Sequence, residues 1–339
     1  MSPKALITGI TGQDGYFLSQ LLINKGYQVY GLARRKSNCD LGSLSFLPPP
    51  VFSQIKIIWG DITDNVLIDK IIKDEQFTEV YHLAAQSYVA HSFVSPRTTY
   101  DINIGGTLNL VNALKDYSPQ TKLYFAATSE MFGRVQETPQ TEHTPFYPRS
   151  PYAISKLAGF WTVKNYREAY HLFFVNGISF NHESEMRGPE FVTQKIVRAA
   201  VALSRGSLEP LAIGNLDAER DWGYAGDYVL GMWQMLQQTE PDDYILATGI
   251  SHSVRHFTEQ VFSRLGFNLI WSGQGLSEVG RDVASDRTLV VVDPVNFRPA
   301  EVERIRGDAS KAKTKLGWAP HVEFEELIKI MINYELQRK

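Results

Sequence analysis

The chain has 339 residues, more than the roughly 250–300 at which a single hydrophobic core stops growing, so we expect two lobes. Its hydrophobic and charged fractions, 43% and 21%, are those of an ordinary globular protein, and a net charge of -3 provides no basic field for nucleic acid or an anionic membrane. No apolar run approaches the roughly 20 residues that span a bilayer, and the single cysteine, Cys39, excludes an internal disulfide and fits a reducing compartment, so we expect a cytoplasmic protein.

Short apolar, β-branched runs alternate with amphipathic stretches through the first half of the chain. The runs predict strands at 4–8, 28–32, 55–59, 79–83, 122–126 and 173–178. The stretches between them predict helices, for instance at 15–25, 64–73, 103–114 and 152–170. This alternation is typical of parallel βαβ units. It predicts an α/β fold with a Rossmann-like, doubly wound parallel sheet that carries helices on both faces.

The regular alternation weakens after about residue 180, where Gly and Pro become frequent. We therefore expect a Rossmann domain over residues 1–180 and a smaller C-terminal lobe, mainly over 181–339. That lobe would cover the carboxyl ends of the strands, where ligands of such sheets bind. Two short apolar runs, at 211–213 and 244–247, are candidates to return to the main sheet.

A glycine-rich turn follows the first predicted strand and opens the first predicted helix. Glycine permits positive φ and close approach of the backbone to a pyrophosphate, and a helix N-terminus offers free N–H groups and a positive dipole end to that anion. A tight turn without a ligand would use the same glycines, but this position in the fold favours a dinucleotide site. The candidate cofactor residues of the turn are Gly9, Thr11, Gly12, Gln13, Asp14 and Gly15.

The end of the second strand distinguishes between the two nicotinamide cofactors. An NAD-binding protein usually has Asp or Glu there, whereas this chain has Arg34, Arg35, Lys36 and Ser37. Guanidinium groups suit a 2′-phosphate, so the sequence favours NADP over a merely solvated basic loop. The ends of the third and fourth strands add further candidate cofactor residues: Asp61, Ile62, Leu83, Ala84, Ala85, Gln86 and Ser87.

Tyr152 and Lys156 lie one helical turn apart, after Ser150 and Pro151, which fit the cap and first turn of a helix. A lysine ammonium beside the tyrosine would lower the pKa of the hydroxyl and allow acid–base chemistry near neutral pH. Thr128 and Glu130 follow the fifth strand and would point into the same cleft. Glu130 adds a second acid–base group that a simple dehydrogenase does not need, although it could also be an exposed carboxylate at a strand end.

Several longer strings resemble the GDP-mannose 4,6-dehydratase family of the extended short-chain dehydrogenase/reductase superfamily. They are 8–15 (TGITGQDG), 128–130 (TSE), 145–153 (PFYPRSPYA), 181–184 (NHES), 191–193 (FVT), 220–223 (RDWG), 297–302 (FRPAEV) and 307–308 (GD). The resemblance runs from residue 5 to about 320. It implies dehydration of a GDP-sugar by internal hydride transfer through tightly bound NADP, and a homo-oligomer, either dimer or tetramer.

Carried over onto matching positions, the family pattern implies Thr128, Glu130, Tyr152 and Lys156 as catalytic residues. His182 and Arg187 would contact NADP, as would Tyr152 and Lys156. The implied nucleotide-sugar residues are Ser87, Glu130, Asn181, Val192, Lys195, Arg220, Arg298 and Glu301. No metal site is expected, since His252 and His256 lie one turn apart without a third ligand in sight.

The chain departs from the family at Glu185, Met186 and Gln194, where one arginine is lost, an acid is gained and a second arginine is replaced. These changes leave the identity of the sugar nucleotide open. A 4-epimerase or 4-keto reductase would need Tyr152 and the cofactor but no base for the hydrogen on C5, so Glu130 is the residue that discriminates. A non-catalytic NADP sensor would keep the glycine turn without needing Tyr152 and Lys156.

Overall fold

The computed structural model describes residues 2–35, 37, 40–296, 302 and 304–338. Its strands are β1 (Lys4–Thr8), β2 (Gln28–Ala33), β3 (Ile55–Trp59), β4 (Glu79–His82), β5 (Lys122–Thr128), β6 (Phe174–Ser179), β7 (Asn181–Glu183), β8 (Leu211–Ile213), β9 (Glu219–Tyr224), β10 (Asp243–Leu246), β11 (Ser251–Ser253), β12 (Leu269–Ser272), β13 (Val279–Asp282) and β14 (Thr288–Val292). Its α-helices are α1 (Gln13–Asn24), α2 (Pro49–Phe52), α3 (Asn65–Glu75), α4 (Val89–Val94), α5 (Pro96–Tyr100), α6 (Gly106–Tyr117), α7 (Pro151–Tyr170), α8 (Val192–Ser204), α9 (Ala225–Leu236), α10 (Val254–Arg264), α11 (Ser310–Leu316) and α12 (Phe324–Gln337). Single turns are η1 (Gly42–Phe46), η2 (Asp101–Gly105), η3 (Ser129–Met131), η4 (Gly275–Ser277) and η5 (Pro294–Asn296).

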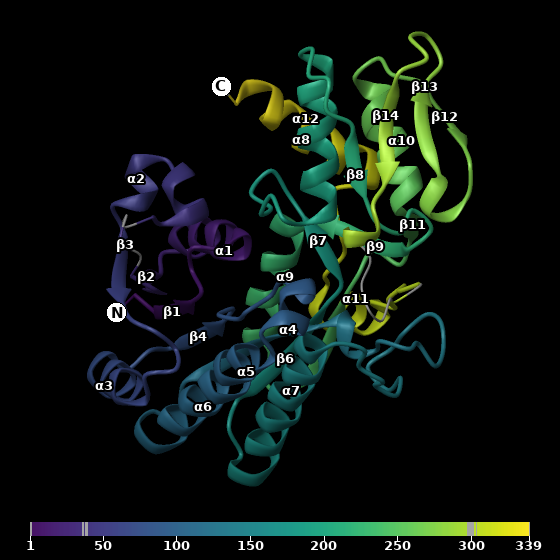
Figure 1. Ribbon diagram of the computed structural model, residues 1–339. Helices are drawn as coiled ribbons and strands as arrows, with labels where there is room; N and C mark the ends of the chain where they lie inside the picture. The colour runs from purple at the N-terminus through teal and green to yellow at the C-terminus, as the bar shows by residue number, and fades with distance from the viewer. Residues whose placement is uncertain (1, 36, 38–39, 297–301, 303, 339) are drawn as a thin grey trace.

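The main sheet has seven strands in the order β10-β6-β5-β4-β1-β2-β3, and every pairing in it is parallel. Helices α1 and α9 pack on one face and α3, α6 and α7 on the other (Figure 1). Strands β4 and β6 are buried along their whole length, as strands covered on both faces must be. The predicted doubly wound α/β fold is confirmed.

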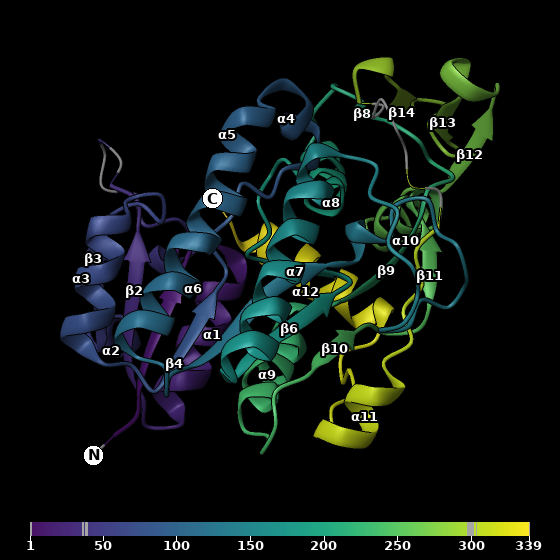
Figure 2. The same cartoon turned by 90° about the horizontal axis from the view of Figure 1, so that it is seen from below.

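The remaining strands form two small sheets in the other part of the molecule. One has the order β11-β9-β7 and the other β12-β13-β14-β8, and helices α8, α10 and α12 pack with them around a third hydrophobic core (Figure 2). Strand β10 pairs with β6 in the main sheet, which confirms the predicted return of the run 244–247. The run 211–213 does not return, because Leu211 and Ile213 are buried in the third core and β8 pairs with β14.

Helix α7 begins where the sequence indicates. The Ser150 hydroxyl accepts a hydrogen bond from the backbone N–H of Ala153 at 3.0 Å, and Pro151 occupies the first turn, where its missing N–H is not needed. This start is what sets the position of Tyr152 and Lys156 along the helix. Within the part of the chain that the structure describes, no helix is long and apolar enough to cross a membrane.

The edge strand β10 is tied to helix α7 by a buried ionic cluster. Asp243 accepts two hydrogen bonds from the Arg167 guanidinium, at 2.8 and 3.0 Å, and a third from Asn176 at 2.9 Å. The side chains of Arg167 and Asp243 are 11% and 9% exposed, so each charge is stabilised mainly by the other and little by water.

Replacing Asp243 with alanine leaves the Arg167 charge and the Asn176 amide without their partner in the interior. We expect Asp243→Ala to lower the free energy of unfolding by about 3 kcal/mol, measured from urea midpoints. Arg97→Ala is the matched control, since it breaks an exposed ion pair with Asp101 and should leave the midpoint nearly unchanged. Equal effects of the two substitutions would contradict the assigned role of the cluster.

Candidate active site

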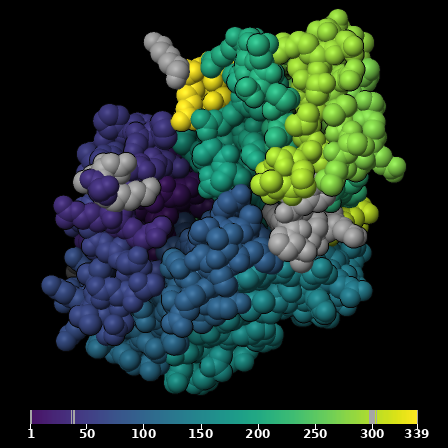
Figure 3. Space-filling view, in the orientation of Figure 1, coloured from purple at the N-terminus to yellow at the C-terminus, as the bar shows by residue number. Residues whose placement is uncertain are grey.

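Three adjoining hollows run along the carboxyl ends of the main-sheet strands, where the purple and blue N-terminal part meets the teal segment in Figure 3. We call them the glycine-turn hollow, the central hollow and the α8 hollow. The first two share Gly9, Gly12, Leu83, Ala85 and Ser87. The central and α8 hollows share Asn181, Arg187 and Phe191. An extended ligand could therefore lie across all three.

The glycine turn is shaped by close packing as much as by backbone conformation. Gly9 has φ +72°, and a Cβ there would lie 2.7 Å from the backbone nitrogen of Ala84. A Cβ on Gly15 would lie 2.1 Å from the carbonyl oxygen of Ile10. Gly12 has an ordinary extended conformation, φ -82°, and caps α1. Of these glycines, only Gly9 needs positive φ, while Gly12 leaves the helix N-terminus open to a ligand.

A buried ion pair joins the first turn of α1 to strand β7. His182 Nε2 lies 3.0 Å from Asp14 Oδ2, and its Nδ1 lies 2.8 Å from the carbonyl oxygen of Phe180. Both partners can only accept, so both ring nitrogens donate and His182 is an imidazolium. Burial alone would lower the pKa of His182, but the Asp14 carboxylate outweighs it and raises that pKa; likewise, burial alone would raise the pKa of Asp14, but His182 lowers it.

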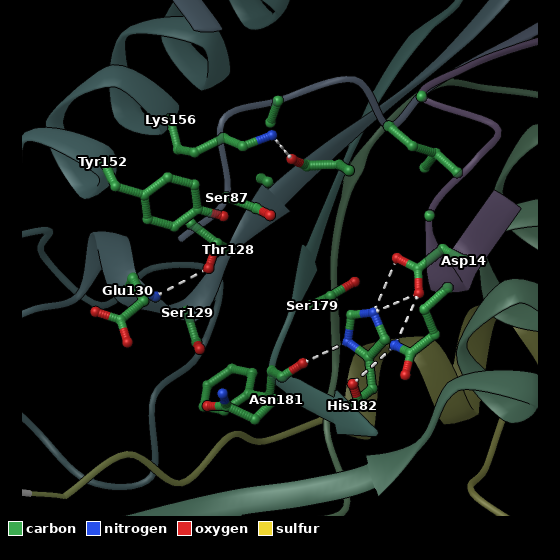
Figure 4. Close-up of a pocket in the computed structure, with 18 of the residues that line it drawn as sticks. Asp14, Ser87, Thr128, Ser129, Glu130, Tyr152, Lys156, Ser179, Asn181 and His182 are labelled. Atoms are coloured by element: carbon green, nitrogen blue, oxygen red, sulfur yellow. Dashed lines mark hydrogen bonds and ion pairs between the residues drawn. The ribbon is translucent and has the colours of Figure 1, made fainter. Parts of the chain in front are cut away.

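Tyr152 and Thr128 meet in the central hollow, and Figure 4 shows the Tyr152 hydroxyl directed toward Thr128 and Ser87. Burial raises the pKa of Tyr152 to about 12, and the Glu130 carboxylate adds to this, while a hydrogen bond with Thr128 opposes it. The expected lowering of the Tyr152 pKa is therefore not what this geometry produces, because the cost of burying a phenolate is the larger effect.

Lys156 points into the central hollow but does not pair with Tyr152. Its ammonium donates to the carbonyl oxygen of Ala126 at 2.8 Å, and burial lowers the pKa of this lysine to about 8. The carbonyl thus orients the ammonium toward the sheet rather than toward the tyrosine hydroxyl one turn away. Lys156 retains two further N–H groups for a ligand in the same hollow.

Glu130 is held at the end of β5 by the turn η3. Its backbone N–H donates to the Thr128 hydroxyl oxygen at 3.3 Å, which makes Thr128 the cap of that turn. The Glu130 side chain lines the central hollow and is 7% exposed. The hollow thus contains a phenol, an alcohol and a carboxylate, a set suited to proton transfer at neighbouring atoms of one substrate.

The α8 hollow carries the cationic groups. Lys195 donates to the Asn296 side chain at 2.8 Å, and Arg220 donates to the carbonyl oxygens of Glu219 and Val302 at 2.9 and 2.7 Å. Between this hollow and the central one, the Arg187 guanidinium lies 3.5 Å over the Phe191 ring and pairs with buried Glu183 at 3.0 Å. Such groups suit an anionic, partly aromatic ligand such as a nucleoside diphosphate.

Most predicted site residues line these hollows. The central hollow includes Gly9, Gly12, Gln13, Asp14, Gly15, Leu83, Ala85, Ser87, Thr128, Glu130, Tyr152, Lys156, Asn181, His182 and Arg187. The glycine-turn hollow adds Thr11, Arg34, Asp61, Ile62 and Ala84, and the α8 hollow adds Val192, Lys195 and Arg220. Lys36, Arg298 and Glu301 lie outside the described residues.

A few predicted residues are described but do not line a hollow. Arg35 and Ser37 are exposed beyond the glycine-turn hollow. Gln86 is used by the protein itself: its side chain donates to the Tyr88 carbonyl oxygen and the Thr99 hydroxyl, both at 3.2 Å. Gln86 follows the fourth strand, where residues that bind a ligand are expected, but its amide forms hydrogen bonds within the protein instead.

Two hydroxyl residues of the central hollow, Ser129 and Ser179, were not singled out from the sequence. They stand at or just beyond the carboxyl ends of the neighbouring strands β5 and β6. The rule that ligands bind at the carboxyl ends of parallel strands could have found both.

The departures from the family pattern lie away from this groove. Glu185, Met186 and Gln194 are absent from the described lining of the three hollows. Gln194 is buried and directs its amide toward Glu335 on α12. Burial raises the pKa of the Glu185 carboxyl, which lies near Tyr16 and Tyr224. None of the three residues therefore lines the described part of these hollows.

Comparison with known proteins agrees with the motifs. The profile of the family described as "GDP-mannose 4,6 dehydratase" matches residues 6–331. The chain is 48% identical to the human GDP-mannose 4,6 dehydratase, covering 98% of this chain and 91% of the relative, and 46% identical to that of Vibrio cholerae, covering 99% and 95%. A Bacillus anthracis dTDP-glucose 4,6-dehydratase solved with NAD has a TM-score of 0.81 at 21% identity, covering 99% of this chain and 97% of the other.

The ion pair of Asp14 and His182 predicts a pH-dependent stability. The raised pKa of His182 contributes stability that is complete below its ordinary value of 6.5 and is lost as the pH rises through the folded value. The lowered pKa of Asp14 contributes stability that is complete above its ordinary 3.8 and is lost as the pH falls through the folded value. The difference in unfolding free energy between wild type and Asp14→Asn should therefore be largest between pH 3.8 and 6.5, with wild type the more stable.

Urea midpoints of both proteins between pH 4 and 9 measure this difference. It should narrow steadily above pH 6.5. Asp74→Asn, which alters an exposed carboxylate on α3, is the control and should show no such maximum. A difference between wild type and Asp14→Asn that stays constant across the range would contradict the charge assignment.

Proposed function

Because the chain belongs to the GDP-mannose 4,6-dehydratase family, we propose that it converts GDP-D-mannose to GDP-4-keto-6-deoxy-D-mannose with loss of water. NADP is the proposed cofactor. When bound, it would accept a hydride from C4 of the sugar and donate one to C6, so the reaction needs no outside redox partner. The steps left to the protein are to hold both ligands and to move protons.

The described residues fit a dinucleotide. Gly12 leaves the N-terminus of α1 open for a pyrophosphate, and the Asp14 charge beside it is already paired with His182. Arg34 lines the glycine-turn hollow together with Asp61 and Ile62, where it would meet the adenosine end. A guanidinium at that place favours a 2′-phosphate, which is the basis for proposing NADP.

The first proton transfer is assigned to Tyr152. Its hydroxyl faces Thr128, so the sugar 4-hydroxyl can give up its proton to this pair as the C4 hydrogen leaves. Lys156 lies in the same hollow, where its ammonium donates to the Ala126 carbonyl oxygen and keeps two N–H groups that can hold a ribose hydroxyl of the cofactor. The resulting 4-ketone makes the hydrogen on C5 acidic.

Glu130 is the observation that carries the proposal. A carboxylate within the same hollow as Tyr152 can remove the proton from C5 and pass it to the C6 hydroxyl, which leaves as water. The proton that Tyr152 took from the 4-hydroxyl can then be returned to C5 as C6 is reduced. An epimerase has no use for this second base. The α8 hollow, with Asn181, Lys195 and Arg220, is the proposed seat of the GDP group.

Glu130→Gln tests the dehydration directly. We expect turnover of GDP-mannose, followed by mass spectrometry as the loss of one water, to fall at least about 100-fold, because general acid–base catalysis contributes that much or more. Glu75→Gln, which alters a half-buried carboxylate paired with Lys4 outside the three hollows, is the control and should leave turnover unchanged. Undiminished turnover in Glu130→Gln would refute the mechanism.

Arg34→Ala tests the choice of cofactor. Because a charged hydrogen bond is worth about 1.5–3 kcal/mol, we expect affinity for NADPH to fall about 10- to 100-fold while affinity for NADH stays within about 2-fold. Arg35→Ala is the matched control, because Arg35 lies outside the glycine-turn hollow and should have the smaller effect. Equal losses for the two nucleotides would mean that Arg34 does not contact the 2′-phosphate.

A further inference from the structure

Ser179 is a buried hydroxyl in the floor of the central hollow that the mechanism above does not use. It ends strand β6, where its register partner on β5 is Thr128, and it is 6% exposed. Among the described residues, its Oγ has no hydrogen-bond partner. Figure 4 shows Ser179 between the Thr128 side of the hollow and the pair formed by Asp14 and His182.

Two polar side chains near Ser179 are paired with each other and do not bond its hydroxyl. Asp14 and His182 bind each other, and the second nitrogen of His182 binds the Phe180 carbonyl oxygen. Burial raises the pKa of the Tyr124 hydroxyl, and the nearby Ser179 hydroxyl lowers it in part. Like Ser179, however, the Tyr124 hydroxyl lacks a hydrogen bond of ordinary geometry. A buried hydroxyl without a partner costs about 1–3 kcal/mol, so the site favours a ligand group that can complete the bond.

The other side chains of the floor limit what that ligand can be. Ala126, Phe180 and Met232 line the same hollow and offer no polar side-chain group. A sugar has hydroxyls around its ring and would leave several of them unpaired there, whereas a nicotinamide ring is apolar except for one carboxamide. One hydroxyl in an apolar floor matches one polar substituent on a flat ring.

We propose that Ser179 is a positioning residue whose hydroxyl accepts a hydrogen bond from the carboxamide of the nicotinamide, a proposal that rests on the function proposed above. The carboxamide is attached to C3 of the ring, next to C4, which exchanges the hydride. Neighbouring strands lie about 4.8 Å apart, so a carboxamide on Ser179 holds that carbon beside Thr128 and Tyr152. Ser179 therefore sets the rotation of the ring relative to the sugar.

Calorimetric titration of Ser179→Ala with three nucleotides tests this contact. NADP⁺ should bind about 5- to 10-fold more weakly than to wild type, as expected for one hydrogen bond. The analogue 3-acetylpyridine adenine dinucleotide phosphate has a methyl group in place of the amide nitrogen, so its affinity should change less than about 2-fold. Adenosine 2′,5′-bisphosphate has no nicotinamide, and its affinity should not change.

Ser118→Ala is the matched control, because Ser118 is fully buried after α6 and its hydroxyl is already bonded to Thr121 at 2.8 Å. It should cost stability and leave NADP⁺ affinity intact, whereas Ser179→Ala loses no internal hydrogen bond and should keep the melting temperature of wild type. NADP⁺ affinity within 2-fold of wild type in Ser179→Ala, or equal weakening of all three nucleotides, would overturn the inference. Failure of wild type itself to bind NADP⁺ would refute the proposed cofactor as well.

Discussion

The contact between the first turn of α1 and strand β7 is the interaction on which the geometry of the groove depends. Asp14 pairs with His182, and the Gln13 amide donates to the His182 carbonyl oxygen and accepts from Ser184 at 3.0 and 2.7 Å. His182 also stacks on Tyr228 of α9 at 4.7 Å. These bonds fasten the chain at the point where it leaves the main sheet for the smaller sheets, and so they hold the floor between the cofactor side and the substrate side.

The same pair resolves an electrostatic conflict. A carboxylate in the first turn of a helix is favourable for the helix itself, but it would repel a pyrophosphate bound at that N-terminus. The imidazolium of His182 lies on the Asp14 carboxylate and neutralises it, so the free N–H groups and the dipole remain available to an anion. The charge at the glycine turn is therefore balanced by a residue 168 positions away in the chain that is folded against it.

The reacting groups are placed by a second constraint, the parallel register of β5 and β6. Thr128 and Ser179 are Cα partners at the ends of these strands, and η3 carries Glu130 just beyond. Helix α7 brings Tyr152 and Lys156 over the same ends. The residues proposed for proton transfer and for contact with the cofactor thus line one hollow at this edge of the sheet. The divergent residues Glu185, Met186 and Gln194 are not among the described lining residues of the three hollows.

The local pattern of the sequence was enough to predict the doubly wound sheet, the glycine turn and the start of α7, because alternation, glycine and capping residues act through near neighbours. Strands β1 and β3 were predicted at the bounds that the structure has, and the family resemblance was confirmed. Pairings between distant segments could not be predicted in this way: strand 211–213 pairs with β14, and the Gln86 amide donates to Thr99 on α5. Tertiary structure also set the pKa of Tyr152 and the direction of Lys156, since burial raises that pKa and the Ala126 carbonyl oxygen accepts a hydrogen bond from the lysine. The physical reason is that desolvation and ion pairing depend on every group that surrounds an atom, and those groups come from parts of the chain that only the folded protein brings together.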